Sequence, residues 1–377
     1  MTRIGFCATW QATDPNANSG YAFSIRRQLQ SRDFQISDLF LDRRAFRWLF
    51  AVHKLAARRR GAFYAYDREP LYLASLAHSV DEWSRRERLD AIVCPTSLPI
   101  TRYRGPVPTI FVTDQVFPAA VGHYWANVSE RYRRLGMAQE REALAHCAAA
   151  SFPSRWAVEA ALRECGADPR RVHEIPWGAN LYEAPGRGAV ERMLHNRPRD
   201  ECVLVFIGRD WSRKGGDLVL ATVDELHKLG IRCRLTVVGA LPPAPIPDWV
   251  SVVPFIDKQT AVGSRRFFAL MAGAHLLFMP SRAEAFGQVY CEAAAFAIPS
   301  VARAVGGVPS IVRDSVNGIL LQPEQASATE FAKQIAALWS DRDAYVRMAL
   351  AARDEYERRL NWDRFGEQFT AVIRSVL

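Results

Sequence analysis

Short apolar runs alternate along the chain with segments of helical periodicity. The runs that predict buried strands span residues 4–8, 91–94, 109–112, 148–152, 203–207, 235–238 and 276–279. Helical patterns between them span residues 24–30, 155–164, 218–229 and 328–339. Strands that alternate with helices form parallel sheets covered by helices on both faces, so the pattern predicts an α/β fold. Ligands of such folds bind at the carboxyl ends of the strands.

The length of the chain predicts two domains. Its 377 residues exceed one ordinary domain, and a hydrophobic fraction of 49% is enough for two cores. We expect the polar, glycine-rich segment 178–198 to be a linker. No run reaches the ~18 apolar residues of a membrane-spanning helix, and residues 1–9 have a strand pattern instead of the apolar core of a signal peptide. The seven scattered cysteines, without C-x-x-C spacing, predict reduced, buried thiols in a cytoplasmic protein.

Two glutamates frame the segment that follows the run 276–279. Glu284 falls in the expected strand-to-helix loop, Gly287 lies near the helix start, and Glu292 lies about one and a half turns into the helix. Backbone N–H groups at a helix start attract phosphate. An ionised carboxylate accepts several hydrogen bonds, which suits sugar and ribose hydroxyls. Taken alone, such a pair is more often two solvated helix-end glutamates, so the neighbouring motifs decide between the two interpretations.

A second strand-to-helix loop carries basic residues. Gly208 ends the run 203–207, Arg209 and Lys214 follow, and two glycines precede the next helix. Glycine lets the backbone approach a ligand, and Arg and Lys can neutralise a diphosphate. The P-loop pattern G-x-x-x-x-G-K-[ST] is absent. A basic surface turn is the alternative interpretation.

Together these segments resemble the retaining glycosyltransferases of family four, which have the GT-B fold of two Rossmann-like domains facing across a cleft. Further segments match the family in order: 151–157 (SFPSRWA), 175–180 (IPWGAN), 235–239 (LTVVG), 305–309 (VGGVP) and 317–318 (NG). The resemblance covers nearly the whole chain and is strongest from 151 to 321. It implies an acceptor-side domain at 1–178, a nucleotide-sugar-binding domain at 179–360, and a C-terminal helix at 361–377 that crosses back onto the first domain.

The resemblance assigns roles to individual residues. It implies that the donor is bound by Gly20, Gly208, Arg209, Lys214, Glu284, Ala285, Phe286, Gly287 and Glu292. Arg209 and Lys214 would hold the diphosphate and stabilise its charge as it leaves, Glu284 would contact the sugar hydroxyls, and Glu292 would contact the ribose. The loop at Gly20 departs from the family's common Gly-Gly form because Ser19 comes first.

Two residues of the first domain are candidates for the acceptor side. Asp114 follows the run 109–112, where the family often has a histidine or an aspartate close to the reacting sugar. It is therefore the candidate active-site carboxylate, and a turn-forming aspartate at a strand end is the alternative. His123 lies in the following loop and could line the acceptor site, although a lone loop histidine is more often plain surface.

The resemblance implies an enzyme that transfers a sugar, with retention of the anomeric configuration, from a UDP- or GDP-linked donor to an acceptor. The sequence does not identify the acceptor. The resemblance places the reaction in the synthesis of glycans, glycolipids or glycoconjugates. No cofactor and no metal are expected. The D-x-D sequence at Asp341 and Asp343 falls between two helices, where it predicts a helix cap. There are two alternatives. One is a catalytically silent GT-B protein that binds sugar nucleotides as a scaffold, and the other is a GT-B phosphorylase that uses pyridoxal phosphate.

The formal charge of +9 adds a possible partner. Residues 41–60 hold seven basic residues and one acidic residue, interleaved with aromatic and aliphatic side chains. A basic helix with aromatic residues suits an anionic membrane surface, which would place a cytoplasmic protein at the inner membrane face. An ordinary amphipathic helix with a solvated basic face is the alternative. No nucleic acid is expected, because no nucleic-acid-binding motif accompanies the charge.

Overall fold

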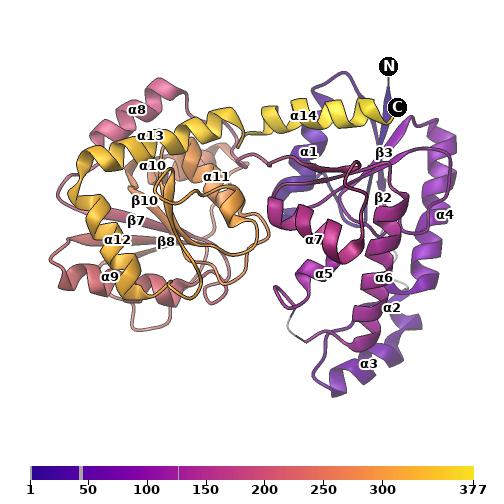
Figure 1. Cartoon of the computed structure of the whole chain (residues 1–377), viewed down its shortest axis with the longest axis horizontal. Coiled ribbons are helices and arrows are strands. Elements are labelled where there is room, and N and C mark those ends of the chain that lie inside the picture. The colour runs from indigo at the N-terminus through magenta and orange to yellow at the C-terminus, as the bar shows by residue number, and fades with distance from the viewer. Residues whose placement is uncertain (1, 42–45, 126) are drawn as a thin grey trace. The chain divides into compact units, whose positions relative to one another are not determined.

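The computed structural model describes residues 2–41, 46–125 and 127–377, and the chain divides into two compact units (Figure 1). Unit 1 comprises Met1–Pro176 and Phe365–Leu377, and unit 2 comprises Trp177–Arg364. Each unit contains one six-stranded sheet in which the strands pair in parallel. The predicted α/β class and the two Rossmann-like parallel-sheet domains of the GT-B fold are confirmed.

In unit 1 the strands follow the order β2-β1-β3-β4-β5-β6. They are β1 (Arg3–Ala8), β2 (Gln35–Phe40), β3 (Ala91–Cys94), β4 (Thr109–Val112), β5 (Ala149–Phe152) and β6 (Val172–Glu174). The helices are α1 (Tyr21–Gln30), α2 (Phe46–Leu49), α3 (Ala51–Arg59), α4 (Pro70–Glu87), α5 (Phe117–Ala120), α6 (Glu130–His146) and α7 (Arg155–Cys165), with 3₁₀ turns η1 (Ala17–Gly20) and η2 (Tyr66–Arg68). The central strands β3, β4 and β5 are buried along their whole length, as their apolar sequences require.

In unit 2 the strands follow the order β12-β11-β10-β7-β8-β9. They are β7 (Cys202–Ile207), β8 (Cys233–Val238), β9 (Val250–Val253), β10 (Leu276–Met279), β11 (Ser300–Arg303) and β12 (Gly318–Leu321). The helices are α8 (Arg187–Asn196), α9 (Gly216–Lys228), α10 (Ala261–Gly273), α11 (Gln288–Ala295), α12 (Ala328–Ser340) and α13 (Arg342–Arg358), with the 3₁₀ turn η3 (Val308–Ser310). The strand order reverses between β7 and β10, which is where open α/β sheets bind their ligands.

The last helix, α14 (Trp362–Ser375), begins in unit 2 and continues in unit 1. Its segment in unit 1 packs closely on that domain. A Cβ added at Gly366 would lie 2.4 Å from the guanidinium carbon of Arg32 and 2.6 Å from Oε1 of Gln28. Glycine at this position therefore allows the helix to approach the end of α1.

The prediction that residues 178–198 form a linker is wrong for the second half of that segment. Helix α8 occupies Arg187–Asn196, and its Val190 and Leu194 are buried. Nη1 of Arg187 lies 2.7 Å from carboxylate oxygens of both Asp354 and Glu357 on α13. Gly186 stands at the N-cap of α8, so the glycines mark the start of a docked helix.

The seven cysteines are buried and free, as the sequence predicted. Burial raises the pKa of Cys147 and Cys165 to about 12, so both thiols stay protonated at neutral pH. Within the described ranges, no helix is both long enough and apolar enough to cross a membrane.

Candidate active site

The two loops that were predicted to bind the donor follow neighbouring strands of unit 2. Strand β10 pairs with β7, with Leu276 opposite Leu204 and Leu277 opposite Val205. Residues 208–215 follow β7, and residues 280–287 follow β10. The carboxyl ends of parallel strands meet at one edge of the sheet, so the topology brings both loops to the point where the strand order reverses.

Lys214 and Glu284 form a buried ion pair between these loops. Nζ of Lys214 contacts Oε2 of Glu284. Nη1 of Arg213 lies 4.0 Å from the same carboxylate oxygen and donates a hydrogen bond of 2.9 Å to the carbonyl of Ala283. Two cations therefore lie beside one buried carboxylate, and Nε of Arg213 also lies 3.3 Å from Oδ2 of Asp210.

Two glycines allow the loops to approach each other. Gly215 has φ +79°, and a Cβ there would lie 2.4 Å from the carbonyl oxygen of Pro280 in the opposite loop. A Cβ at Gly208 would lie 3.1 Å from Cγ of Lys214. Gly215 thus sets the conformation and the close approach of the loops, and Gly208 leaves room for the stem of Lys214.

Helix α11 begins after Gly287, as predicted. Gly287 has φ +95°, and a Cβ there would lie 2.5 Å from the ring of Tyr290. The side chains of Ala285 and Phe286 are buried, and the ring of Phe286 packs edge-on against Trp177 at a centroid distance of 5.9 Å. These two residues could therefore contact a donor through their backbone, whereas their side chains belong to the core of unit 2.

Glu292 has a partner that the sequence analysis did not single out. It is buried on α11, and its Oε1 contacts Nζ of Lys258 in the loop between β9 and α10. Nζ of Lys258 also lies 5.1 Å from the ring centroid of Phe267. Burial raises the pKa of Glu292, and the charge of Lys258 opposes that rise. The second predicted donor carboxylate is thus also paired with a lysine.

Arg209 is separate from the Lys214–Glu284 pair. Its side chain is exposed, and its guanidinium carbon lies 4.2 Å from the ring centroid of Phe255. Stacking on the ring face holds the guanidinium plane while its edge can still donate hydrogen bonds. Phe255, which follows β9, is therefore a further residue of this site that the sequence did not indicate.

The loop before α1 in unit 1 has an unusual backbone. Gly20 is the N-cap of α1 with φ 74°, and Asn18 and Ser19 also have positive φ values of 47° and 60°. The predicted position of Gly20, at the end of the loop after β1, is confirmed. Asparagine adopts this left-handed region more readily than serine does, so Ser19 is the strained residue of the three.

Replacing Ser19 by glycine is therefore expected to raise the free energy of unfolding by about 0.5–1 kcal/mol, because relief of the left-handed strain exceeds the entropic cost of glycine. Ser19→Ala is the matched control, since alanine retains the Cβ that causes the strain. Urea denaturation measures both variants. An alanine variant as stable as the glycine variant would show that the backbone at Ser19 is not strained.

Asp114 follows β4 and is half-buried. Its charge acts on Tyr21, whose pKa is raised mainly by burial and further by Asp114. The hydroxyl of Tyr21 donates a hydrogen bond of 2.9 Å to the carbonyl of Pro95, which follows β3. Asp114 therefore belongs to a polar group at the carboxyl ends of β3 and β4, and its catalytic role stays a prediction.

His123 lies among aromatic rings. Its ring centroid is 5.0 Å from that of Tyr124 and 5.0 Å from that of Trp156 on α7. These contacts give the imidazole a packing role within unit 1. Its role on the acceptor side stays a prediction.

The D-x-D sequence is a helix cap, as predicted. Oδ1 of Asp341 accepts a hydrogen bond of 2.9 Å from the backbone N–H of Ala344 at the start of α13. Among the described residues, no three His, Cys, Asp or Glu side chains gather in a way that could hold a metal ion. Independence from metals stays a prediction.

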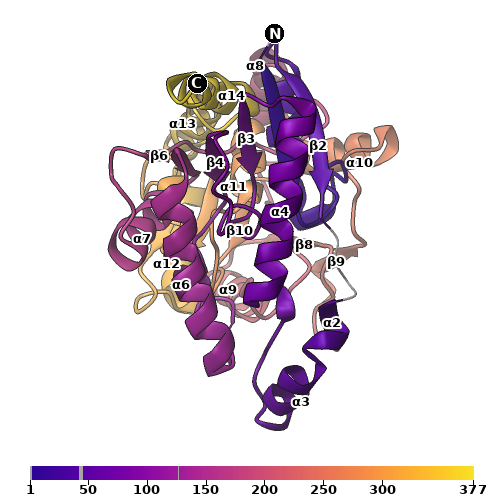
Figure 2. The same cartoon turned by 90° about the vertical axis from the view of Figure 1, so that its right-hand side faces the viewer.

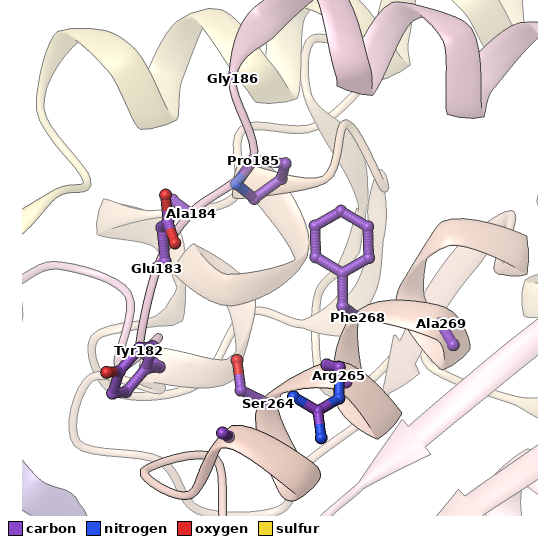
Figure 3. A pocket seen from close by; sticks show the side chains of 10 residues that line it. Tyr182, Glu183, Ala184, Pro185, Gly186, Ser264, Arg265, Phe268 and Ala269 are labelled. Atoms are coloured by element: carbon purple, nitrogen blue, oxygen red, sulfur yellow. The ribbon is translucent and has the colours of Figure 1, made fainter.

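Unit 2 also has a cavity of about 490 Å³ that none of the predicted site residues lines (Figure 3). Segment 182–186 forms one wall and residues of α10 form the other, with Phe268 beside Pro185. Its charged lining residues, Glu183 and Arg265, are exposed. The cavity lies outside the two donor loops.

Two family models together match most of the chain. The model of Glycosyltransferase Family 4 matches residues 20–183, and the model of Glycosyl transferases group 1 matches residues 201–341. Among the curated relatives, a D-inositol 3-phosphate glycosyltransferase of Xylanimonas cellulosilytica is 30% identical over 59% of this chain and 56% of its own length. The corresponding enzyme of Actinosynnema mirum is 33% identical over 55% of this chain and 52% of its own length. The match thus spans about half the length of these relatives.

Solved structures share the fold over the whole chain. Sucrose-phosphate synthase from Thermosynechococcus elongatus has a TM-score of 0.70 at 18% identity, covering 100% of this chain and 99% of that one. HepE of Anabaena in complex with UDP-glucose has a TM-score of 0.64 at 18% identity and covers 100% of both chains. The two family models match most of the chain, and the sheet order and the paired loops after β7 and β10 agree with that match. The chain therefore belongs to glycosyltransferase family 4.

Proposed function

We propose that this chain transfers a sugar from a nucleotide sugar to an acceptor, with retention and without a metal ion. The observation that carries the proposal is the buried Lys214–Glu284 pair, which lies where the strand order of unit 2 reverses. Membership of family 4 supports a transferase. The complexes of the fold neighbour HepE with UDP and with UDP-glucose support a uridine diphosphate sugar as the donor.

The cations of the two loops would bind the diphosphate. Arg209 is exposed and stacked on Phe255, so its N–H groups can reach a phosphate. Lys214 would exchange part of its contact with Glu284 for a phosphate oxygen. The diphosphate gains negative charge as the bond to the sugar breaks, and fixed cations lower the energy of that transition state.

The two carboxylates would orient the donor. The carboxylate of Glu284 contacts Lys214. A carboxylate accepts several hydrogen bonds, so Glu284 would accept bonds from sugar hydroxyls. Glu292 would accept bonds from the ribose hydroxyls while Lys258 keeps the buried carboxylate charged. Asp114 of unit 1 would be the active-site carboxylate of the acceptor side.

Release of nucleoside diphosphate tests the proposal. Pure protein is incubated in EDTA with UDP-, GDP- and ADP-sugars, with and without a panel of candidate acceptors. The panel includes D-inositol 3-phosphate, the compound in the names of the curated relatives. We expect at least one donor to be turned over, with faster release when a suitable acceptor is present. Binding of donors without release would favour a catalytically silent scaffold, and a rate that requires added metal would contradict independence from metals.

Glu292→Gln is expected to raise the KM for the donor by about 10- to 100-fold with kcat little changed, because bonds to a charged group contribute about 1.5–3 kcal/mol. Lys258→Met should weaken donor binding and also lower the free energy of unfolding by about 1–3 kcal/mol, because it leaves the buried Glu292 without its partner. Adding Glu292→Gln to Lys258→Met should restore part of the stability. Steady-state kinetics and urea denaturation measure these effects. Additive stability losses would show that the two side chains do not interact.

A further inference from the structure

Helices α2 and α3 expose large apolar side chains. Trp48 is 72% exposed, Val52 is 77% exposed and Leu55 is 52% exposed. Both views of the structure place these helices at one end of unit 1, beyond the ends of α4 and α6 (Figures 1 and 2). An exposed apolar group at a projecting end is a common feature of a contact surface.

Helix α3 has apolar residues on two opposite faces. On the inner face, Ala57 is buried and the ring of His53 lies 5.9 Å from that of Tyr64. Val52 and Leu55 are three residues apart, so they share a face of the helix, and their positions on the helical wheel lie opposite His53 and Ala57. The inner face accounts for the packing of α3 on unit 1. Among the described residues, the outer apolar face is largely exposed.

The outer face is surrounded by positive charge. Residues 46–60 contain five basic residues, Arg47, Lys54, Arg58, Arg59 and Arg60, and no acidic one. Lys54 and Arg58 are exposed and one helical turn apart, and Arg58 shares a face with Leu55, three residues before it. Arg43 and Arg44, which belong to the predicted segment 41–60, lie outside the described residues.

We propose that a basic–apolar tip of unit 1 binds the surface of an anionic lipid bilayer. This tip consists of Arg47, Trp48, Val52, Lys54, Leu55 and Arg58. A bilayer offers an apolar layer for Trp48, Val52 and Leu55 directly beneath negative headgroups for the basic residues. A second copy of the tip would bring like charges together, which disfavours self-association through this surface. The proposal goes beyond sugar transfer and does not depend on the donor site, because the tip lies in unit 1 and the donor loops lie in unit 2.

Flotation with liposomes tests the proposal on the full chain. Wild type is expected to bind vesicles that contain phosphatidylserine, to bind phosphatidylcholine vesicles at least tenfold more weakly, and to detach as salt screens the charges. Replacing Lys54 and Arg58 by glutamine should lower the partition coefficient by about 30-fold, since each basic residue contributes about a fivefold factor. The matched control is the double variant Lys333→Gln/Arg347→Gln, which replaces two exposed basic residues of unit 2. It should bind the vesicles as wild type does.

A second set of variants tests the apolar contact. The double variant Trp48→Ser/Val52→Ser should lower the partition coefficient by more than tenfold. The control is Leu241→Ser/Val262→Ser, which replaces two residues of unit 2 that are 72% and 69% exposed, and it should leave the partition coefficient unchanged. The tryptophan fluorescence of wild type should shift to shorter wavelength on binding, and Trp48→Phe should lose that shift. Wild type that ignores anionic vesicles at low salt, or equal losses in test and control variants, would overturn the proposal. Donor turnover without lipid, measured in parallel, separates such a failure from a failure of the proposed function.

Discussion

Replacing Lys214 by methionine is expected to lower the rate of sugar transfer by about 10²–10³-fold, the usual cost of removing one donor that stabilises a charge developing in the transition state. Methionine retains the stem that fits beside Gly208, so the loop should keep its shape. Arg209→Ala should have an effect of the same order, because the guanidinium over Phe255 supplies the second cation for the diphosphate. Initial rates at saturating donor measure both variants.

Lys333→Met, in an exposed position on α12, is the matched control and should retain the wild-type rate. Lys214→Met also removes the cation that contacts the buried Glu284, so thermal unfolding must show that the variant is folded. Lys214→Arg keeps the charge and should recover part of the rate. If Lys214→Met and Arg209→Ala both stay within threefold of wild type, these residues do not hold the diphosphate.

Glu284→Gln is expected to lower kcat by about 10- to 100-fold, because the carboxylate is assigned to the sugar that is being transferred and its hydrogen bonds are charge-assisted. Glutamine keeps the shape of the side chain but loses the ion pair with Lys214. The comparison with Glu292→Gln is informative, since that variant should act mainly on KM. The reverse pattern, with the KM effect at Glu284 and the kcat effect at Glu292, would show that the two assignments are exchanged.

The sequence predicted the elements that position the donor loops because their patterns are strong. Strands β7 and β10 are continuous apolar runs that lie inside the sheet, and Gly215 and Gly287 in the loops after them have positive φ values. The predicted sequence of loop, Gly287 and helix around Glu284 and Glu292 is also confirmed. Local chemistry is sufficient for such features, since a buried strand and a helix start are encoded within a few residues.

Three of the strands that the sequence analysis missed, β2, β6 and β9, lie at sheet edges and have weak patterns. Strands β2 and β6 are the outer strands of the sheet in unit 1, and their residues are half-buried or exposed. Strand β9 has the same position in unit 2, and two of its residues are exposed. An edge strand needs no continuous apolar run, so its sequence resembles a loop.

Lys258 and Phe255 could not be predicted for a different reason. Lys258 is 34 residues from Glu292 in sequence, and their contact depends on how α11 packs beside the loop after β9. Nothing in the local sequence distinguishes this lysine from a solvated one. The stacking of Arg209 on Phe255 likewise joins two loops that only the parallel sheet brings together. Partners of this kind are properties of the fold.

A structure of the protein with a bound nucleoside diphosphate sugar, UDP-glucose in the first instance, tests the donor site most directly. The proposed function predicts the diphosphate beside Nζ of Lys214 and the guanidinium of Arg209, the ribose hydroxyls at Glu292, and the sugar hydroxyls at Glu284. A nucleotide seated elsewhere on the chain, with the Lys214–Glu284 and Lys258–Glu292 pairs untouched, would contradict the assignment of the donor site to the loops after β7 and β10.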